Sequence, residues 1–238
     1  MRLPAALSRR ALLYTATIAA LPPLPLRAAD LAAIPVTENI AFSVPPSYYR
    51  PRSRPPAGTY DDTLFVAADY AAGRTASVSR TTCQALLTDA GDPLPLIAGQ
   101  ITSLSDIGKP MTIARLLAAR RDGDPQQAQF ARSEVRDVVK DGDNTLSFTL
   151  LTLATSATSM TTAMPRVRKT QARTMFVGGS TPYLVTAWAS SASPGASCVE
   201  TDCPPCTQLR CGCPPPKCED TTGPDPVDLA IVGSLRVA

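Results

Sequence analysis

Seven cysteines are the most reactive side chains of this 238-residue chain, and six of them lie close together. The six fall between residues 198 and 218, are interleaved with prolines, and are Cys198, Cys203, Cys206, Cys211, Cys213 and Cys218. Such a cluster can close disulfides in several connectivities, or four of its thiolates can bind one zinc ion. The seventh, Cys83, is predicted to be a small core residue.

A redox function would centre on Cys203 and Cys206, which have the spacing of a redox dithiol. Pro205 precedes the second cysteine, however, and no start of a helix, which would lower the pKa of a thiol, is evident there. The plainer interpretation is a surface loop stapled by disulfides. The N-terminal segment indicates export to an oxidising compartment, as described below. Such a compartment favours disulfides over zinc binding.

The chain contains no histidine, and this removes several classes of function. Catalysis by Ser-His-Asp or Cys-His groups, imidazole-bound zinc and the usual proton transfer near neutral pH all need that side chain. Aspartates at Asp141 and Asp143 raise the question of calcium, but the other ligands of an EF-hand loop are missing, so a plain turn is predicted. No catalytic residue is predicted.

Residues 1–29 are typical of a signal peptide. The pair Arg9-Arg10 precedes an apolar run that stops at Pro22, well short of the ~20 apolar residues that span a membrane. Paired arginines favour the twin-arginine export route, with Ala28 or Ala29 as the cleavage residue. The alternatives are a membrane anchor, or a disordered tail in which the arginine pair is accidental.

The charge balance argues against nucleic acid as a partner. The formal charge is +3, but removing the four arginines ahead of Asp30 leaves 19 basic against 20 acidic residues. Phosphate binding needs a surplus of lysine and arginine. The chain from 30 to 238 is long enough to bury the core of one compact domain, with a Cys/Pro-rich insert at 194–224.

A proline-rich stretch from 48 to 56 combines two tyrosines with three arginines and is predicted to be a surface loop. It is a candidate contact for an acidic protein surface, and a solvated connector is the alternative. The candidate partner-binding residues are Tyr48, Tyr49, Arg50, Arg52 and Arg54.

Alternating apolar residues predict antiparallel strands joined by tight turns. Gly73 supplies the positive φ for a hairpin within residues 61–87, and the sequence Asp141-Gly142-Asp143-Asn144 suits a second reversal. The segment 154–164 is either a frayed strand or a loop. The first expected strand is 39–45, with Ile40, Phe42 and Val44 facing inward. The others are 64–66, 75–79, 134–140, 145–153, 174–177 and 183–188.

Two helices are predicted to cover the sheet. One begins at Pro110, and the other is capped by Asp225, has Pro226 at its first position and runs to Val237. Their apolar faces are Met111, Ala114, Leu117 and Ala118 in the first and Val227, Ala230, Ile231, Ser234 and Leu235 in the second.

In the order of these elements and in several short sequence motifs, the chain resembles the PsbP family, extrinsic proteins of the lumenal side of photosynthetic membranes. The similarity extends from about residue 36 to the end of the sequence, interrupted by the cysteine insert. The matching motifs are Ile40-Ala41-Phe42-Ser43-Val44-Pro45, Thr75-Ala76-Ser77-Val78-Ser79, Gly108-Lys109-Pro110, Tyr183-Leu184-Val185-Thr186-Ala187-Trp188-Ala189 and Gly233-Ser234-Leu235-Arg236-Val237.

The resemblance implies an α+β fold, an α/β/α sandwich around a central antiparallel sheet, without enzymatic activity. It implies a peripheral protein of the thylakoid lumen, in a chloroplast or a cyanobacterial-type compartment, that binds photosystem II and its oxygen-evolving complex or assists photosystem assembly. No cofactor is required, no small-molecule substrate is expected, and calcium or manganese binding is allowed by the resemblance. The alternative function is a thiol-redox or metal-binding protein that works through the insert.

The chain departs from the family pattern in two further places. The family often has a histidine beside an arginine before its late hairpin, whereas Arg168 is followed here by Lys169, so a metal role of that histidine cannot be carried over. The N-terminal arm after the signal is also shorter than in the oxygen-evolving subunit, which favours a PsbP-like or PsbP-domain relative.

Overall fold

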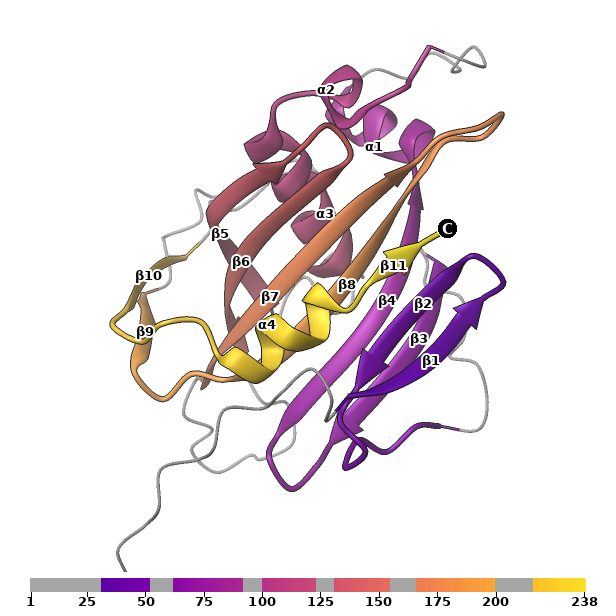
Figure 1. Cartoon of the computed structure of the whole chain (residues 1–238). Helices are drawn as coiled ribbons and strands as arrows, with labels where there is room; N and C mark the ends of the chain where they lie inside the picture. Colours follow the sequence, from indigo (N-terminus) through magenta and orange to yellow (C-terminus); the bar gives the residue numbers. More distant parts are fainter. Residues whose placement is uncertain (1–30, 52–61, 92–99, 123–130, 155–165, 200–215) are drawn as a thin grey trace, which may run out of the picture.

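The structure, a computed structural model, describes residues 31–51, 62–91, 100–122, 131–154, 166–199 and 216–238 (Figure 1). Its described part has an α+β fold with antiparallel sheets. The predicted signal segment, most of the undecided segment 154–164, and several predicted site residues lie outside the described residues. These site residues are Arg52, Arg54, Cys203, Cys206, Cys211 and Cys213.

A sheet of six strands, in the order β3-β4-β8-β7-β6-β5, forms the centre of the molecule. Every neighbouring pair in it is antiparallel. In that order the strands are Asp62–Asp69, Arg74–Thr82, Tyr183–Ala192, Arg166–Val177, Thr145–Ala154 and Ala131–Asp141.

The predicted turns of this sheet are confirmed. Gly73 joins β3 to β4 with a φ of 62°, and Gly142 joins β5 to β6 with a φ of 69°. Glycine reaches this left-handed region without steric cost, which is why both reversals are so tight. The late hairpin is also confirmed, although β7 begins earlier than predicted, at Arg166.

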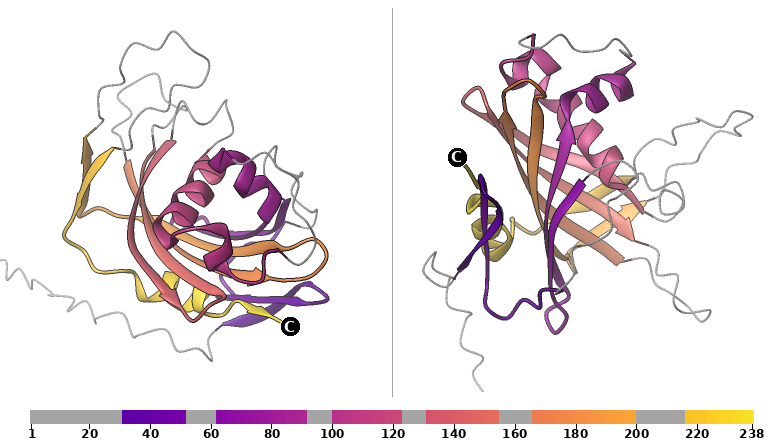
Figure 2. Two further views of the ribbon diagram at one scale, coloured as in Figure 1. Left: turned by 90° about the horizontal axis from the view of Figure 1, so that it is seen from above. Right: turned by 90° about the vertical axis from the view of Figure 1, so that its right-hand side faces the viewer.

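Three helices cover one face of the large sheet: α1 (Cys83–Ala90), α2 (Leu104–Ile107) and α3 (Pro110–Asp122) (Figure 2). The predicted start of α3 at Pro110 is confirmed. Its buried face was predicted with one error, because Met111 is 38% exposed and Ile113, at 1%, lies in the core instead. The core on this face includes Leu86, Leu104, Ile113, Leu117, Leu146, Phe148, Leu150, Leu184 and Trp188.

The opposite face is covered by helix α4 (Pro226–Gly233) and a small antiparallel sheet in the order β1-β2-β11 (Figure 2). The inward side of β2 (Ile40–Val44) is the one predicted, and β1 (Ala32–Thr37) pairs with its outer edge. The core on this face includes Ile40, Phe42, Val44, Tyr48, Ala76, Val78, Val185, Ala187, Ala189, Ile231 and Leu235.

The prediction that the last helix runs to Val237 is wrong. Asp225 caps α4 and Pro226 starts it as expected, but the helix ends at Gly233. Ser234 turns the chain away because its hydroxyl donates to the Ile231 carbonyl and accepts from the Ser43 amide of β2. The next residues form strand β11 (Arg236–Val237), which pairs with β2.

The described part of the cysteine insert is a short hairpin rather than a featureless loop. Strands β9 (Ala196–Val199) and β10 (Lys217–Asp220) pair with each other at one end of the large sheet (Figure 1). Within the described ranges, we find no helix of the length and apolar character needed to cross a membrane.

Candidate functional site

The segment that follows β2 carries three of the five predicted contact residues. Tyr49 and Arg50 lie on the surface, and the Tyr49 side chain is 58% exposed. Tyr48, in contrast, is only 4% exposed and belongs to the core on the α4 face. The prediction that it lies on the surface is therefore wrong: its amide donates to the Pro45 carbonyl, and this local turn places the ring in the core.

Tyr49 is held on the edge of the large sheet by its own backbone. Its amide donates to the Ala68 carbonyl over 2.7 Å, and the Ala68 amide donates back over 3.0 Å. The Tyr49 ring then lies 6.1 Å, centroid to centroid, from the ring of Tyr70. Tyr70 is 77% exposed, so the two rings form an aromatic pair open to solvent. We call the surface formed by Tyr49, Tyr70 and Arg50 the tyrosine patch.

Tyr70 lies in the β3–β4 turn, which a carboxylate keeps in shape. Asp69 accepts hydrogen bonds from the Ala72 amide (3.1 Å) and from the Ser47 hydroxyl (3.0 Å). These bonds to its charged form lower the pKa of Asp69 below its ordinary value, with the Ala72 amide as the largest cause. The turn and the segment leading to Tyr49 are thus fastened to each other.

The far side of the same turn is fastened to the start of α4. The guanidinium of Arg74 donates two parallel hydrogen bonds to the carboxylate of Asp225, over 3.0 and 2.7 Å. Asp225 also accepts from the Val227 amide at 2.8 Å as the N-cap of the helix. Bidentate pairs of this kind are among the stronger charge-assisted hydrogen bonds.

Behind this pair lies a fully buried carboxylate, Asp228 on α4. One of its oxygens accepts from the Ser191 hydroxyl of β8 at 2.6 Å. Its other oxygen lies 3.6 Å from the Arg74 guanidinium and has no hydrogen-bond partner among the described residues. Sequence analysis did not identify this group, because an aspartate in the first turn of a helix normally faces solvent.

Burial raises the pKa of Asp228 to about 6, because the charged form is poorly solvated there. The Ser191 hydrogen bond and the charges of Arg74 and Arg168 act in the opposite direction, while nearby Asp225 adds to the rise. Burial and the negative charge of Asp228 also raise the pKa of Tyr48 to about 12. The buried tyrosine and the buried carboxylate therefore share one electrostatic environment.

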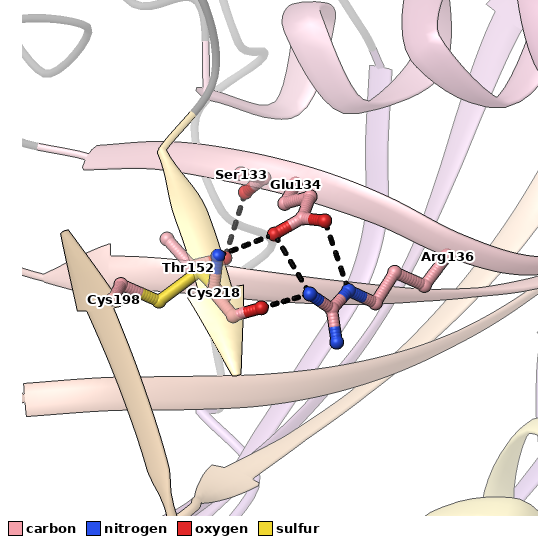
Figure 3. Close-up of a disulfide and its surroundings, with 6 residues drawn as sticks. All are labelled: Ser133, Glu134, Arg136, Thr152, Cys198 and Cys218. Carbon is pink, nitrogen blue, oxygen red and sulfur yellow. Dashed lines mark hydrogen bonds and ion pairs between the residues drawn. A yellow bond between two sulfur atoms is a disulfide. The ribbon is translucent and has the colours of Figure 1, made fainter. Parts of the chain in front are cut away.

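The cysteine insert contains one disulfide in its described part, which joins Cys198 to Cys218 with an S–S distance of 2.03 Å (Figure 3). The two residues face each other in the register of β9 and β10. The expectation of disulfides is confirmed for this pair. Cys83 is a free, fully buried thiol, as predicted, and burial raises its pKa to about 12, which keeps it protonated and inert.

The disulfide hairpin is attached to strand β5 by a pair of charged residues (Figure 3). The Cys218 amide donates to Glu134 over 2.7 Å, and Arg136 donates to the Cys218 carbonyl. Glu134 and Arg136 also form an ion pair with each other over 3.0 Å. Both backbone groups of Cys218 are thereby satisfied by side chains of the large sheet, which fixes the hairpin on it.

A second attachment involves Lys169 of β7, whose side chain is almost fully buried. It forms an ion pair with Asp220 and donates to the carbonyls of Thr222 and Gly223, over 2.6 and 3.0 Å. Within the described ranges, no three His, Cys, Asp or Glu side chains are grouped so that they could hold a metal ion.

No protein-family model matches this chain, and no curated protein matches it either. Among solved structures, it has a weak similarity to the crystal structure of LpqN, described as involved in cell envelope biogenesis of Mycobacterium tuberculosis. The two chains share 10% identity with a TM-score of 0.28, over 68% of this chain and 78% of that chain. A similarity at this level supports no conclusion about function.

Proposed function

We propose that this protein is a non-enzymatic accessory protein of photosynthesis with a PsbP-like fold. In this proposal it is exported by a twin-arginine signal to the thylakoid lumen, or to a cyanobacterial-type lumen, and stays peripheral to the membrane. Its partner is the lumenal face of a photosystem complex, with photosystem II and the oxygen-evolving complex as the partner that the sequence resemblance implies. It supports assembly or the oxygen-evolving site by binding, not by turnover.

The tyrosine patch is the observation that carries this proposal. Tyrosine and arginine are the residue types that most often dominate binding energy at protein interfaces. Tyr49 and Tyr70 present large rings to solvent. The backbone of Tyr49 is hydrogen-bonded to the edge of the sheet, and Tyr70 lies in a turn that Asp69 holds through two hydrogen bonds. A rigid pair loses little conformational entropy on binding, which favours a role in recognition.

The sign of charge around the patch favours an acidic partner. Arg50 is exposed, and Arg52 and Arg54 follow it in the sequence, outside the described residues. Charges at the rim of an interface steer association and set its salt dependence more than its final affinity. We therefore expect binding to weaken as ionic strength rises.

Charge reversal tests this function directly. The triple variant R50E/R52E/R54E should bind washed thylakoid membranes more weakly than the wild type, in a cosedimentation assay at low salt. The variant Y49S/Y70S should also bind weakly, since it removes the aromatic surface. The matched control is Arg115→Glu, which reverses one exposed arginine on α3, at the other face of the sheet. Unchanged binding of both patch variants would discard the tyrosine patch as the contact.

The alternative, a thiol-redox or metal-binding protein, would depend on the remaining cysteines of the insert. The pairing of Cys198 with Cys218 supports a structural role for these two residues. Mass determination before and after reduction, together with zinc analysis, separates the two functions. Turnover of a dithiol substrate that disappears on replacing Cys203 and Cys206 would favour the alternative. Calcium or manganese binding remains a proposal from the resemblance, without nominated ligands.

A further inference from the structure

We infer that Asp228 is a proton-operated latch, which holds the β3–β4 turn and the tyrosine patch against helix α4 when it is protonated and loosens them when it ionises. The biological meaning of this regulation rests on the proposed function. The latch itself is a property of the free chain and can be tested without any partner.

The geometry connects Asp228 to the patch through the β3–β4 turn. Arg74, at the end of the turn, reaches the carboxylates of Asp225 and Asp228 on α4. At the start of the turn, Asp69 holds Ser47, and Ala68 holds Tyr49 through two backbone hydrogen bonds. Any displacement of the turn from α4 therefore moves the segment that carries Tyr49 and Arg50.

Tyr48 connects the same elements from inside the core. Its ring packs in the cluster that also contains Ile231 and Val232 of α4. Its hydroxyl and one oxygen of Asp228 are both buried, and neither has a hydrogen-bond partner among the described residues. Buried polar groups without partners are costly, so the contact between this segment and α4 is poorly compensated when Asp228 carries a charge.

The charged and titratable groups that face Asp228 come from every element packed around it. The Asp225 carboxylate lies at the start of its own helix, and Arg74 approaches from β4. Arg168 of β7 acts on it electrostatically while donating to the Gly73 carbonyl of the turn at 3.2 Å. Tyr48 faces it from the segment after β2. Two positive charges therefore face Asp228, yet burial outweighs them.

The pH range of the latch follows from the composition of the chain. With no histidine, few side chains titrate between pH 5 and 8. Asp69 and Asp225 have lowered pKa values and remain ionised throughout this range, whereas Asp228 titrates at about 6. Burial also raises the pKa of Asp122, which lies at the end of α3 on the opposite face of the sheet. It provides a matched control.

The direction follows from proton linkage. A carboxyl group whose pKa is about 6 when buried and 3.8 when solvated favours the closed arrangement most at low pH. Ionisation shifts the balance toward an open arrangement in which water reaches the carboxylate. With these two values, the open fraction rises about tenfold between pH 5 and pH 8. The tyrosine patch is therefore best organised for binding on the acid side of pH 6.

Hydroxyl-radical footprinting of the free, full chain, read out by peptide mass spectrometry, tests the latch. The Tyr48 ring is 4% exposed and packs in the cluster that contains Ile231 and Val232 of α4, so its oxidation relative to that of exposed Tyr70 reports the open fraction. In the wild type we expect this fraction to rise about tenfold from pH 5 to pH 8. In Asp228→Asn we expect it to change less than about twofold, because the titrating group is gone.

Two further variants make the result decisive. Asp122→Asn should keep the tenfold rise, because Asp122 lies on the other face. Ser191→Ala removes the hydrogen bond that favours the ionised form of Asp228, so the midpoint of the rise should move to higher pH. A pH-independent wild type, a persistent rise in Asp228→Asn or its loss in Asp122→Asn would each overturn the latch. Failure of the thylakoid-binding test would not, because the footprint is measured without a partner.

Discussion

Replacing Cys198 and Cys218 together by alanine should lower the free energy of unfolding by about 4 kcal/mol. The disulfide joins residues 20 positions apart, and constraining a loop of this length in the unfolded chain is worth ~3 kcal/mol. Cys218 is 3% exposed and packs with Leu151, Leu153 and Val167, so losing its sulfur should cost ~1 kcal/mol more. For a chain of this length, the total corresponds to a fall in Tm of roughly 10 °C.

Urea unfolding followed by the fluorescence of Trp188 measures this loss, because the single tryptophan is buried in the core on the helical face. Cys83→Ala is the control, since it also removes a buried sulfur but leaves the disulfide intact. It should show a smaller loss that is the same with and without reductant. If the double variant unfolds within ~1 kcal/mol of the wild type, the hairpin is not part of the cooperative unit and the reasoning fails.

Three further predictions concern the core and the caps. Leu117→Ala should cost ~2–5 kcal/mol in urea unfolding, because Leu117 is fully buried between α3 and the sheet. Ser79→Ala should cost ~1–3 kcal/mol in the same assay, because it leaves the buried indole N–H of Trp188 without its acceptor. Asp225→Ala should cost ~1–2 kcal/mol at pH 7, since it removes an N-cap and the partner of Arg74. Burial alone would raise the pKa of Asp225, but hydrogen bonds from Arg74 and the Val227 amide lower it overall. Its stabilisation is therefore complete above about pH 4 and disappears as pH falls, so the variant and the wild type should converge in acid unfolding.

The hairpins of the large sheet could be predicted because their signals are local. Alternation on each strand and a glycine at Gly73 and Gly142 specify strand, turn and strand within a few residues. Helix α3 was equally visible through Pro110 and its helical apolar spacing, yet its phase was misjudged by counting Met111 as buried. Spacing tells which residues share a face, but only the neighbouring layer decides where that face begins.

Short elements whose own sequence carries a weak signal were missed. Strand β1 contains Pro35, and its sequence shows little of the alternation between apolar and polar residues that is typical of a strand. Pairing with β2 stabilises it. Helix α1 has only eight residues and follows directly on β4, where its threonine N-cap, Thr82, resembles strand sequence. Strand β11 is two residues long and exists because β2 offers an unpaired edge.

The candidate site was predicted in part. Tyr49 and Arg50 are exposed as expected, whereas Tyr48 is buried because a local turn directs it inward. Tyr70 was missed because it lies outside the arginine-rich stretch and joins Tyr49 only through the fold. The pairing of Cys198 with Cys218 could not be deduced either, since six clustered cysteines allow many connectivities. An aromatic residue in a tight turn is the signal that could have identified Tyr70.

The pairing of β11 with β2 has a consequence for the order of events in folding. The two strands are almost two hundred residues apart in the chain, and the Ala238 amide also donates to the Asn39 carbonyl. The small sheet thus has very high contact order, so pairing β11 with β2 closes a long loop of chain, and we expect this layer to form late in folding.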